Sequence, residues 1–186
     1  FMQLIVISSG KILDNEAQLI TNLFEAGLET FHLRKNNLST RGIKKIICEI
    51  PTQFHNRIVI HSHHLLAKQF KLKGIHLSKK HQEKKFRTWF YIRIIKLFNP
   101  NIIITTSFHS IENLLSLNHK YNYQYCFLSP IFDSLNSKFQ SGFSEHSLKS
   151  ALAKTKTKVI ARGGIKPDTV LKSKELFIIN FKRLFT

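Results

Sequence analysis

Two adjacent glycines, Gly163 and Gly164, follow an apolar run that begins at Val159, and their chemistry suits phosphate binding. Because glycine has no Cβ, its backbone can adopt positive φ and bring bare N–H groups close to an anion. Pro167 and Asp168 follow as helix-start residues, and a helix N-terminus facing the same point would add its dipole. A Gly-Gly pair is also an ordinary tight turn, so the phosphate interpretation depends on where the fold places it.

Basic and imidazole side chains follow two earlier apolar runs. His32 and Arg34 lie two residues apart, so in a strand both would point to one side. A guanidinium suits phosphate or pyrophosphate because it donates two parallel hydrogen bonds, although Arg34 could also be a salt-bridged rim residue. His61, His63 and His64 invite a metal-site interpretation. We do not favour it, because His61 and His63 lack an obvious carboxylate or thiolate partner.

The elements that must position these residues are short β-branched runs alternating with amphipathic stretches. Helical spacing is clear in Ile43, Ile46, Ile47 and Ile50, and Pro51 ends that helix. The fourth strand is followed by a basic loop and then an aromatic helix. Strands are predicted at residues 4–7, 30–34, 57–60, 74–77, 102–106, 125–128, 158–161 and 176–180.

Seven or eight such units, with strands apolar on both faces, predict a parallel sheet with both sides covered. An open doubly wound sheet is an alternative, but no Gly-x-Gly-x-x-Gly follows the first strand. We therefore expect the α/β fold class: one domain over residues 1–186, a TIM-type (β/α)8 barrel incomplete at its last β/α unit. In that barrel, phosphate is commonly held after strands seven and eight, where Gly163 and Gly164 fall.

The composition of the chain indicates which kinds of partner it can bind and in which compartment it works. The chain has 29 Lys+Arg against 11 Asp+Glu, a net charge of +18, which predicts attraction to phosphates on metabolites, lipid or nucleic acid. Cys48 and Cys126 lack Cys-x-x-Cys spacing and are predicted to be buried free thiols in a reducing compartment. We find no membrane-length apolar run or signal-peptide pattern, so we expect a cytoplasmic protein with no membrane partner.

The segments at successive strand ends form an ordered set. They are Phe31 to Asn36, Ile60 to Ser62, Gly74 to His81, Thr105 to Ser110, Ser129 to Phe132, and Gly163 with Gly164. In order and spacing, this set resembles the thiamine phosphate synthase and thiazole tautomerase superfamily, over most of the chain up to Ile165. The family's Gln-x-Arg-x-Lys is matched by His32 and Arg34, with Asn36 at the lysine position. Its Ile-Asn-Asp becomes Ile60 to Ser62, and its Gly-x-His-x-Gly-Gln-x-Asp becomes Gly74 to His81.

The resemblance implies a role for each matched position. Phosphate, pyrophosphate and the transferred group would be handled at one rim of the barrel. The implied catalytic residues are Arg34, Lys138, His109 and His32, and the implied substrate- and phosphate-binding residues are Asn36, His61, Lys79, Ser107, Ser129, Ser134, Ser137, Gly163 and Gly164.

The resemblance also implies a reaction. In the synthases, hydroxymethylpyrimidine pyrophosphate ionises, a thiazole phosphate captures the cation through its nitrogen, and magnesium with basic side chains neutralises the pyrophosphate that leaves. The two aspartates that hold magnesium there are replaced here by Ser62 and His81, and Asp133 is the candidate substitute. Mg²⁺ is therefore expected only if the chain is an active synthase, and lysines such as Lys79 could replace part of its charge.

Two alternatives stay open beside a thiamine phosphate synthase-like transferase. A thiazole tautomerase acting on thiazole carboxylate phosphate needs no cofactor but needs an acid–base histidine. Pro130 stands at that position, which leaves His109 or His32 as the base. The other alternative is a non-catalytic binder of phosphate ligands or nucleic acid, suggested by the bases and aromatics from Lys84 to Lys96. We favour phosphorylated small molecules over nucleic acid as partners, and a homo-oligomer is left open.

Overall fold

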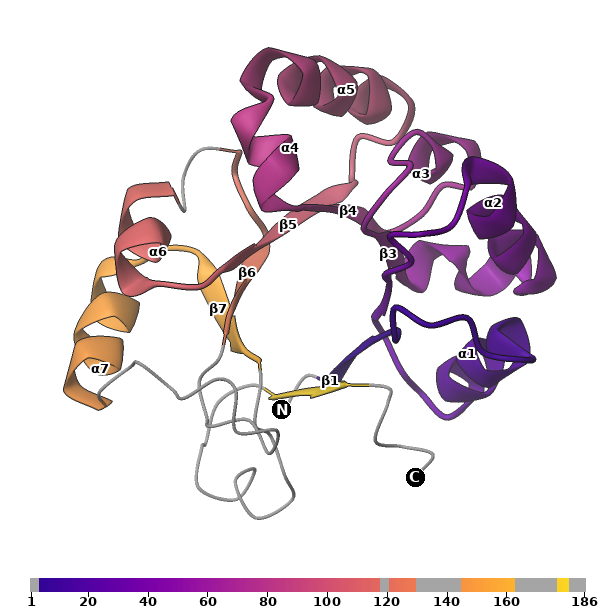
Figure 1. Cartoon of the computed structure of the whole chain (residues 1–186), viewed down its shortest axis with the longest axis horizontal. Coiled ribbons are helices and arrows are strands. Elements are labelled where there is room, and N and C mark those ends of the chain that lie inside the picture. Colours follow the sequence, from indigo (N-terminus) through magenta and orange to yellow (C-terminus); the bar gives the residue numbers. More distant parts are fainter. Residues whose placement is uncertain (1–3, 118–120, 130–144, 163–176, 181–186) are drawn as a thin grey trace. The chain divides into compact units, whose positions relative to one another are not determined.

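The computed structural model describes residues 4–117, 121–129, 145–162 and 177–180 of the chain. Strands and helices alternate through these residues (Figure 1), as the sequence predicts. Their contacts divide the chain into two compact units, one built from Leu4–Ile103 and the other from Ile104–Ile179. Each unit carries polar side chains at the ends of its own strands.

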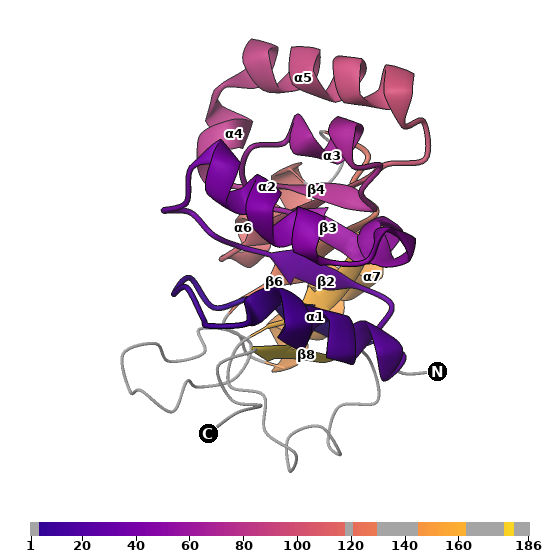
Figure 2. The ribbon, with the colours of Figure 1, turned by 90° about the vertical axis from the view of Figure 1, so that its right-hand side faces the viewer.

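The first unit is a run of parallel strands with helices between them. β1 pairs with β2, β2 with β3 and β3 with β4, and Figure 2 shows α1, α2 and α3 side by side along this sheet. Its elements are β1 (Leu4–Ile7), α1 (Glu16–Glu25), β2 (Phe31–Leu33), α2 (Thr40–Glu49), a 3-10 helix (Thr52–Arg57), β3 (Ile58–Ile60), α3 (Leu66–Gln69), β4 (Gly74–Leu77), α4 (Lys79–Glu83) and α5 (Lys85–Phe98).

The core of this unit explains why its strands are continuously apolar. Every residue of β2, β3 and β4 is buried, as expected for parallel strands that are covered on both faces. Helix α1 buries Ile20 and Phe24 against the sheet, and α2 buries Ile43 and Ile47. Each such side chain contributes about 1.5–3 kcal/mol by leaving water. The predicted helical spacing of α2 is therefore confirmed.

Helix caps set two of the loops that lead into the site. The Gly42 amide donates to Ser39 Oγ (3.2 Å) at the start of α2. At the start of α4, Ser78 and His81 form a reciprocal capping box. The prediction of a basic loop after β4 is therefore wrong, since residues Lys79–Glu83 form a helix. The capping box supplies the physical reason, because it satisfies free backbone groups of a short, highly charged turn.

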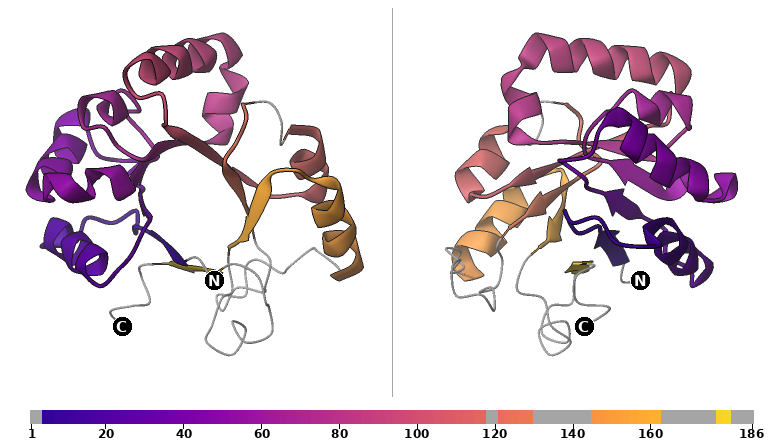
Figure 3. Two further views of the ribbon diagram at one scale, coloured as in Figure 1. Left: turned by 180° about the vertical axis from the view of Figure 1, so that it is seen from behind. Right: turned by 45° about the vertical axis from the view of Figure 1, so that its right-hand side comes forward.

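The second unit repeats the pattern with β5 (Ile103–Phe108), α6 (Ile111–Leu117), β6 (Tyr125–Leu128), α7 (Glu145–Lys154) and β7 (Lys158–Ala161). β5 pairs in parallel with β6, and β6 with β7, and both panels of Figure 3 show α6 and α7 on one side of these strands. Ser110 Oγ accepts from the Asn113 amide (3.2 Å) and so caps the start of α6. A further strand, β8, covers Phe177–Asn180.

The two cysteines differ in exposure. Cys126 is buried in β6, and this burial raises the pKa of its thiol to about 12. Cys48 is exposed, so its predicted burial is wrong. Cys48 comes directly after the buried Ile47 on α2. The turn of the helix between these two residues carries the Cys48 side chain away from the sheet. Among the described residues, no helix is long and apolar enough to cross a membrane.

Candidate active site

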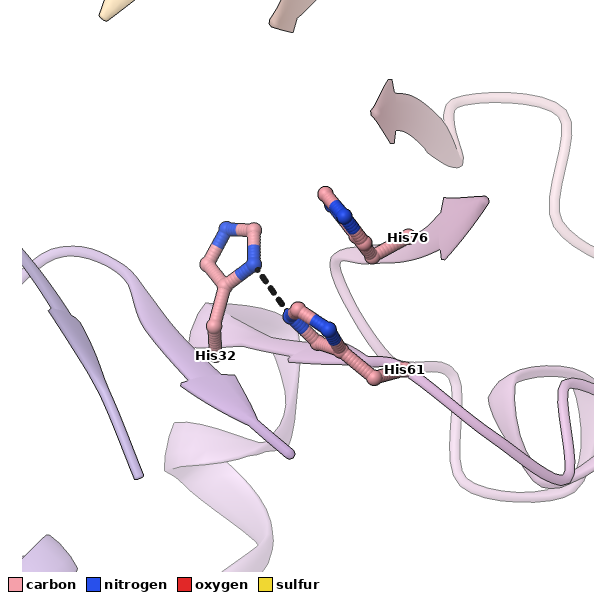
Figure 4. A group of neighbouring side chains, drawn as sticks. All are labelled: His32, His61 and His76. Carbon is pink, nitrogen blue, oxygen red and sulfur yellow. Dashed lines mark hydrogen bonds between the residues drawn. The ribbon is translucent and has the colours of Figure 1, made fainter. Parts of the chain in front are cut away.

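Three buried histidines converge at the ends of neighbouring strands in the first unit (Figure 4). His32 comes from β2, His61 directly follows β3, and His76 lies in β4. His32 Nδ1 lies 2.9 Å from His61 Nε2, at hydrogen-bond distance. The rings of His61 and His76 are stacked, with centroids 4.1 Å apart and planes 19° apart. We call these three residues the histidine cluster.

Strand register explains the convergence. Leu33 pairs with Ile60 and Ile60 with Ile75, so one residue further along Arg34, His61 and His76 are level with one another. The His61 amide donates to Leu33 O (3.2 Å), which continues the ladder beyond β3. Side chains at equal levels of parallel strands point to the same side, and a residue two positions earlier does too. His32, which is level with Val59 and Gly74, therefore joins the other two from two residues earlier in the register.

The sequence interpretation found two members of the cluster and missed the third. It placed His32 and His61 in the site separately, and it tested the metal hypothesis on His61 with His63. In the structure, His63 turns away, with Nδ1 2.8 Å from Thr40 Oγ1 and Nε2 2.9 Å from Leu38 O. His76 lies in the segment from Gly74 to His81, which matches the family pattern, but it was not among the predicted site residues. A histidine at the ends of three successive strands is the signal that could have revealed the group.

Arg34 and its neighbour Lys35 have different surroundings. The Arg34 backbone is held by Ser8, whose hydroxyl accepts from the Arg34 amide (2.7 Å) and lies 3.1 Å from its carbonyl. The Arg34 guanidinium makes no hydrogen bond or ion pair with any residue in the described part of the chain, and it is half-buried. Asn36, at the lysine position of the family pattern, is exposed.

Lys35 was not among the predicted site residues, yet it is completely buried. Its ammonium lies 2.7 Å from Glu16 Oε1, donates to Ser9 O (2.8 Å) and also donates to Lys11 O. Burial raises the pKa of Glu16, and the hydrogen bond from Lys35 opposes that rise. Lys35 thus anchors the loop that enters α1, while Asn36 stands at the lysine position of the family motif.

The two positions that hold magnesium aspartates in the family pattern are occupied differently here. The Ser62 hydroxyl lies 3.4 Å from Lys35 O. His81 Nδ1 accepts from the Ser78 amide (3.2 Å) and lies 2.8 Å from Ser78 Oγ. Burial, with help from the Lys84 charge, lowers the pKa of His81. One neutral hydroxyl and one helix-capping imidazole do not suit Mg²⁺, which prefers carboxylate and water oxygens.

A second imidazole, His64, contacts His81, with ring centroids 4.5 Å apart. His64 Nε2 donates to His76 O (3.1 Å), which ties the loop after β3 to β4. Burial, and then the nearby His81, lower the pKa of His64 to about 4. Lys79, predicted to bind phosphate, is exposed at the first position of α4.

The second unit brings together two other predicted residues. His109 Nδ1 donates to Ser129 O (3.0 Å), and the Ser129 amide donates to Phe108 O (3.1 Å). His109 is exposed, while Ser107 lies half-buried in β5, paired in register with Phe127. The ends of β5 and β6 therefore carry an accessible imidazole. The predicted residues Asp133, Ser134, Ser137, Lys138, Gly163 and Gly164 lie outside the described residues, as does the predicted incompleteness of the last unit.

The order of parallel strands and intervening helices, with polar groups at the strand ends, defines the α/β class to which TIM-type barrels belong. Comparison with known proteins extends this result. A family model described as thiamine monophosphate synthase matches residues 4–176. The chain therefore belongs to the thiamine monophosphate synthase family.

Solved structures agree on the fold. The chain resembles a thiamine phosphate pyrophosphorylase from Bacteroides thetaiotaomicron, at 29% identity and a TM-score of 0.71, over 96% of this chain and 83% of that one. It also resembles a 3-hexulose-6-phosphate synthase, at 12% identity and a TM-score of 0.61, over 96% of this chain and 90% of that one. The second likeness concerns the fold alone. No curated protein matches the sequence.

Proposed function

We propose that this chain is a thiamine phosphate synthase-like transferase, joining hydroxymethylpyrimidine pyrophosphate to thiazole phosphate with release of pyrophosphate. The observation that carries the proposal is the family match over residues 4–176. The similar Bacteroides protein, a thiamine phosphate pyrophosphorylase, supports the same assignment. Local geometry supports it too, because Arg34 stands at the end of β2, level with His61 and His76.

The main chemical task is to stabilise negative charge on the departing pyrophosphate. A guanidinium can donate two parallel hydrogen bonds to such a group, and Arg34 has no competing partner within the described residues. Lys79 is exposed at the start of α4, directly after β4, and can supply a second positive charge to the pyrophosphate. Fixed positive groups of this kind stabilise charge that develops in the transition state.

Magnesium does not fit the residues present at the family positions. Ser62 and His81 offer no carboxylate, and His81 Nδ1 already caps α4. Among the described residues, charge neutralisation therefore falls to Arg34 and Lys79, which are weaker substitutes for a divalent ion. We expect slow turnover as a result.

The experiment incubates the purified chain with both substrates and measures thiamine phosphate. Product should form, and Arg34→Gln should lower kcat/KM by roughly 10- to 100-fold, the size of losing about 1.5–3 kcal/mol of a charge-assisted hydrogen bond. Arg93→Gln is the matched control, because Arg93 is exposed in the interior of α5 and is not a predicted site residue. Absence of product, or an equal loss in both variants, would count against the proposal.

A further inference from the structure

The histidine cluster consists of nitrogen donors only. His32, His61 and His76 each offer one ring nitrogen, and these three atoms lie within 4.8 Å of one another. Their side chains are buried, with residue exposures of 0%, 8% and 4%. Figure 4 shows the three rings facing a common space from neighbouring strands. No Asp or Glu of the described residues belongs to the group.

We propose that His32, His61 and His76 form a binding site for a divalent transition-metal ion, with Zn²⁺ as the reference ion and a fourth position filled by water or an anion. Imidazole suits Zn²⁺, Cu²⁺, Ni²⁺ and Co²⁺, whereas Mg²⁺ and Ca²⁺ prefer oxygen donors. Three histidines with one open position form a recognised zinc donor set. This site does not depend on the proposed transferase activity, and it uses none of the family's magnesium positions.

Both the spacing and the orientation of the three rings must change when an ion binds. With metal–nitrogen bonds of about 2.0–2.1 Å in a tetrahedron, the ligand nitrogens lie about 3.3 Å apart. The His32 Nδ1 to His61 Nε2 pair, now 2.9 Å apart, must open slightly, and any nitrogen pair near the 4.8 Å limit must close. Rotation of the rings about their side-chain bonds must supply these changes, and it must also turn the stacked His61 and His76 rings so that their in-plane lone pairs meet at the ion. The proton shared between His32 and His61 leaves when both nitrogens bind the ion.

Neighbouring groups set the character of the site. Arg34 is level with His61 on the same side of the sheet, and its positive charge opposes a cation. The same charge favours an anion or hydroxide as the fourth ligand. The His76 backbone is held by His64 through its carbonyl (3.1 Å), which fixes that strand end. The cluster is therefore partly preorganised before an ion arrives.

The first test is calorimetry with Zn²⁺ alone on the full chain, prepared without a histidine tag. One ion should bind, and His32→Gln and His61→Asn should each weaken the affinity by at least ~10-fold. These replacements are the residues that the family pattern carries at the two positions. His146→Gln is the control, because His146 is exposed on α7. The Zn²⁺ affinity of this variant should equal that of the unmodified chain.

A second measurement needs no variant and so does not depend on their folding. Co²⁺ added to the unmodified chain should give the intense visible bands of a four-coordinate ion, and X-ray absorption at the zinc edge should show three imidazole nitrogens. An octahedral Co²⁺ spectrum would overturn the proposal. So would zinc affinity that His32→Gln and His61→Asn leave unchanged, or that His146→Gln lowers as much as they do.

Discussion

Lys35 Nζ lies 2.7 Å from Glu16 Oε1, and both side chains are almost completely withdrawn from solvent. The pair connects the segment after β2, which carries Arg34, to the first residue of α1. Two further acceptors, the carbonyls of Ser9 and Lys11, complete the surroundings of the ammonium. This buried ion pair fixes the position of the strand end on which the proposed chemistry depends.

Removing one member of this pair should strongly destabilise the protein. Lys35→Met leaves Glu16 buried without its partner, and we expect a loss of roughly 3–5 kcal/mol in the free energy of unfolding. Adding Glu16→Gln should recover part of that loss, because the uncompensated charge is removed. Urea unfolding measures both. Lys45→Met is the control, since Lys45 pairs with Glu49 at 3.9 Å on the surface and should cost at most about 0.5 kcal/mol. Equal losses for Lys35 and Lys45 would refute this account of the pair.

Stability should fall in mild acid through His81. Its folded pKa is depressed below the ordinary 6.5, because burial and Lys84 disfavour the charged ring. As the pH falls, the unfolded chain therefore takes up a proton at His81 before the folded chain does. The contribution of neutral His81 to the free energy of unfolding is complete above pH 6.5 and is lost as the pH falls through the folded pKa. His81→Gln keeps an acceptor for the Ser78 amide and cannot be protonated there. The difference in unfolding free energy between the two chains should therefore change between pH 7 and pH 5, and a constant difference would contradict the assignment.

Thiol reactivity should distinguish the two cysteines. Cys48 is exposed, whereas Cys126 is fully buried with a pKa raised to about 12. A disulfide reagent at neutral pH should modify one thiol in the native protein and two after denaturation. Cys48→Ala should abolish the native reaction. Rapid modification of that variant would show that Cys126 is accessible.

Gly74 should not tolerate a side chain. A Cβ at this position would lie 2.7 Å from the carbonyl oxygen of Ile103 and would also collide with the Ile103 side chain. Gly74→Ala should therefore lower the free energy of unfolding by about 1–3 kcal/mol. Gly10→Ala provides the comparison, because a Cβ added to Gly10 would have no heavy atom within 4 Å. Similar thermal stability of the two variants would contradict the predicted clash.

Sequence predicted the elements well where apolar runs were short and bounded. The strands at Gly74–Leu77, Tyr125–Leu128 and Lys158–Ala161 match the predicted ranges residue for residue. α4 was missed because its first turn is stabilised by a Ser78–His81 capping box, in which histidine replaces the usual glutamate or glutamine.

The site was harder to predict, because its groupings depend on contacts between strands. Register brings His76 beside His61, although neither residue identifies the other in sequence. The partnership of Lys35 with Glu16 likewise joins residues from two separate loops, and a lone lysine beside an arginine is usually solvated. Arg34, by contrast, could be placed from the period of a single strand.

The rate of thiamine phosphate formation as a function of Mg²⁺ shows whether this chain works as a transferase without the family's magnesium ligands. The unmodified chain should be slow and nearly indifferent to added Mg²⁺, because Ser62 and His81 offer no carboxylate. The Ser62→Asp/His81→Asp double variant should respond to the ion and form product faster, and each single variant should gain less than half of that effect. Brisk synthesis by the unmodified chain that rises and saturates with Mg²⁺ would contradict the account.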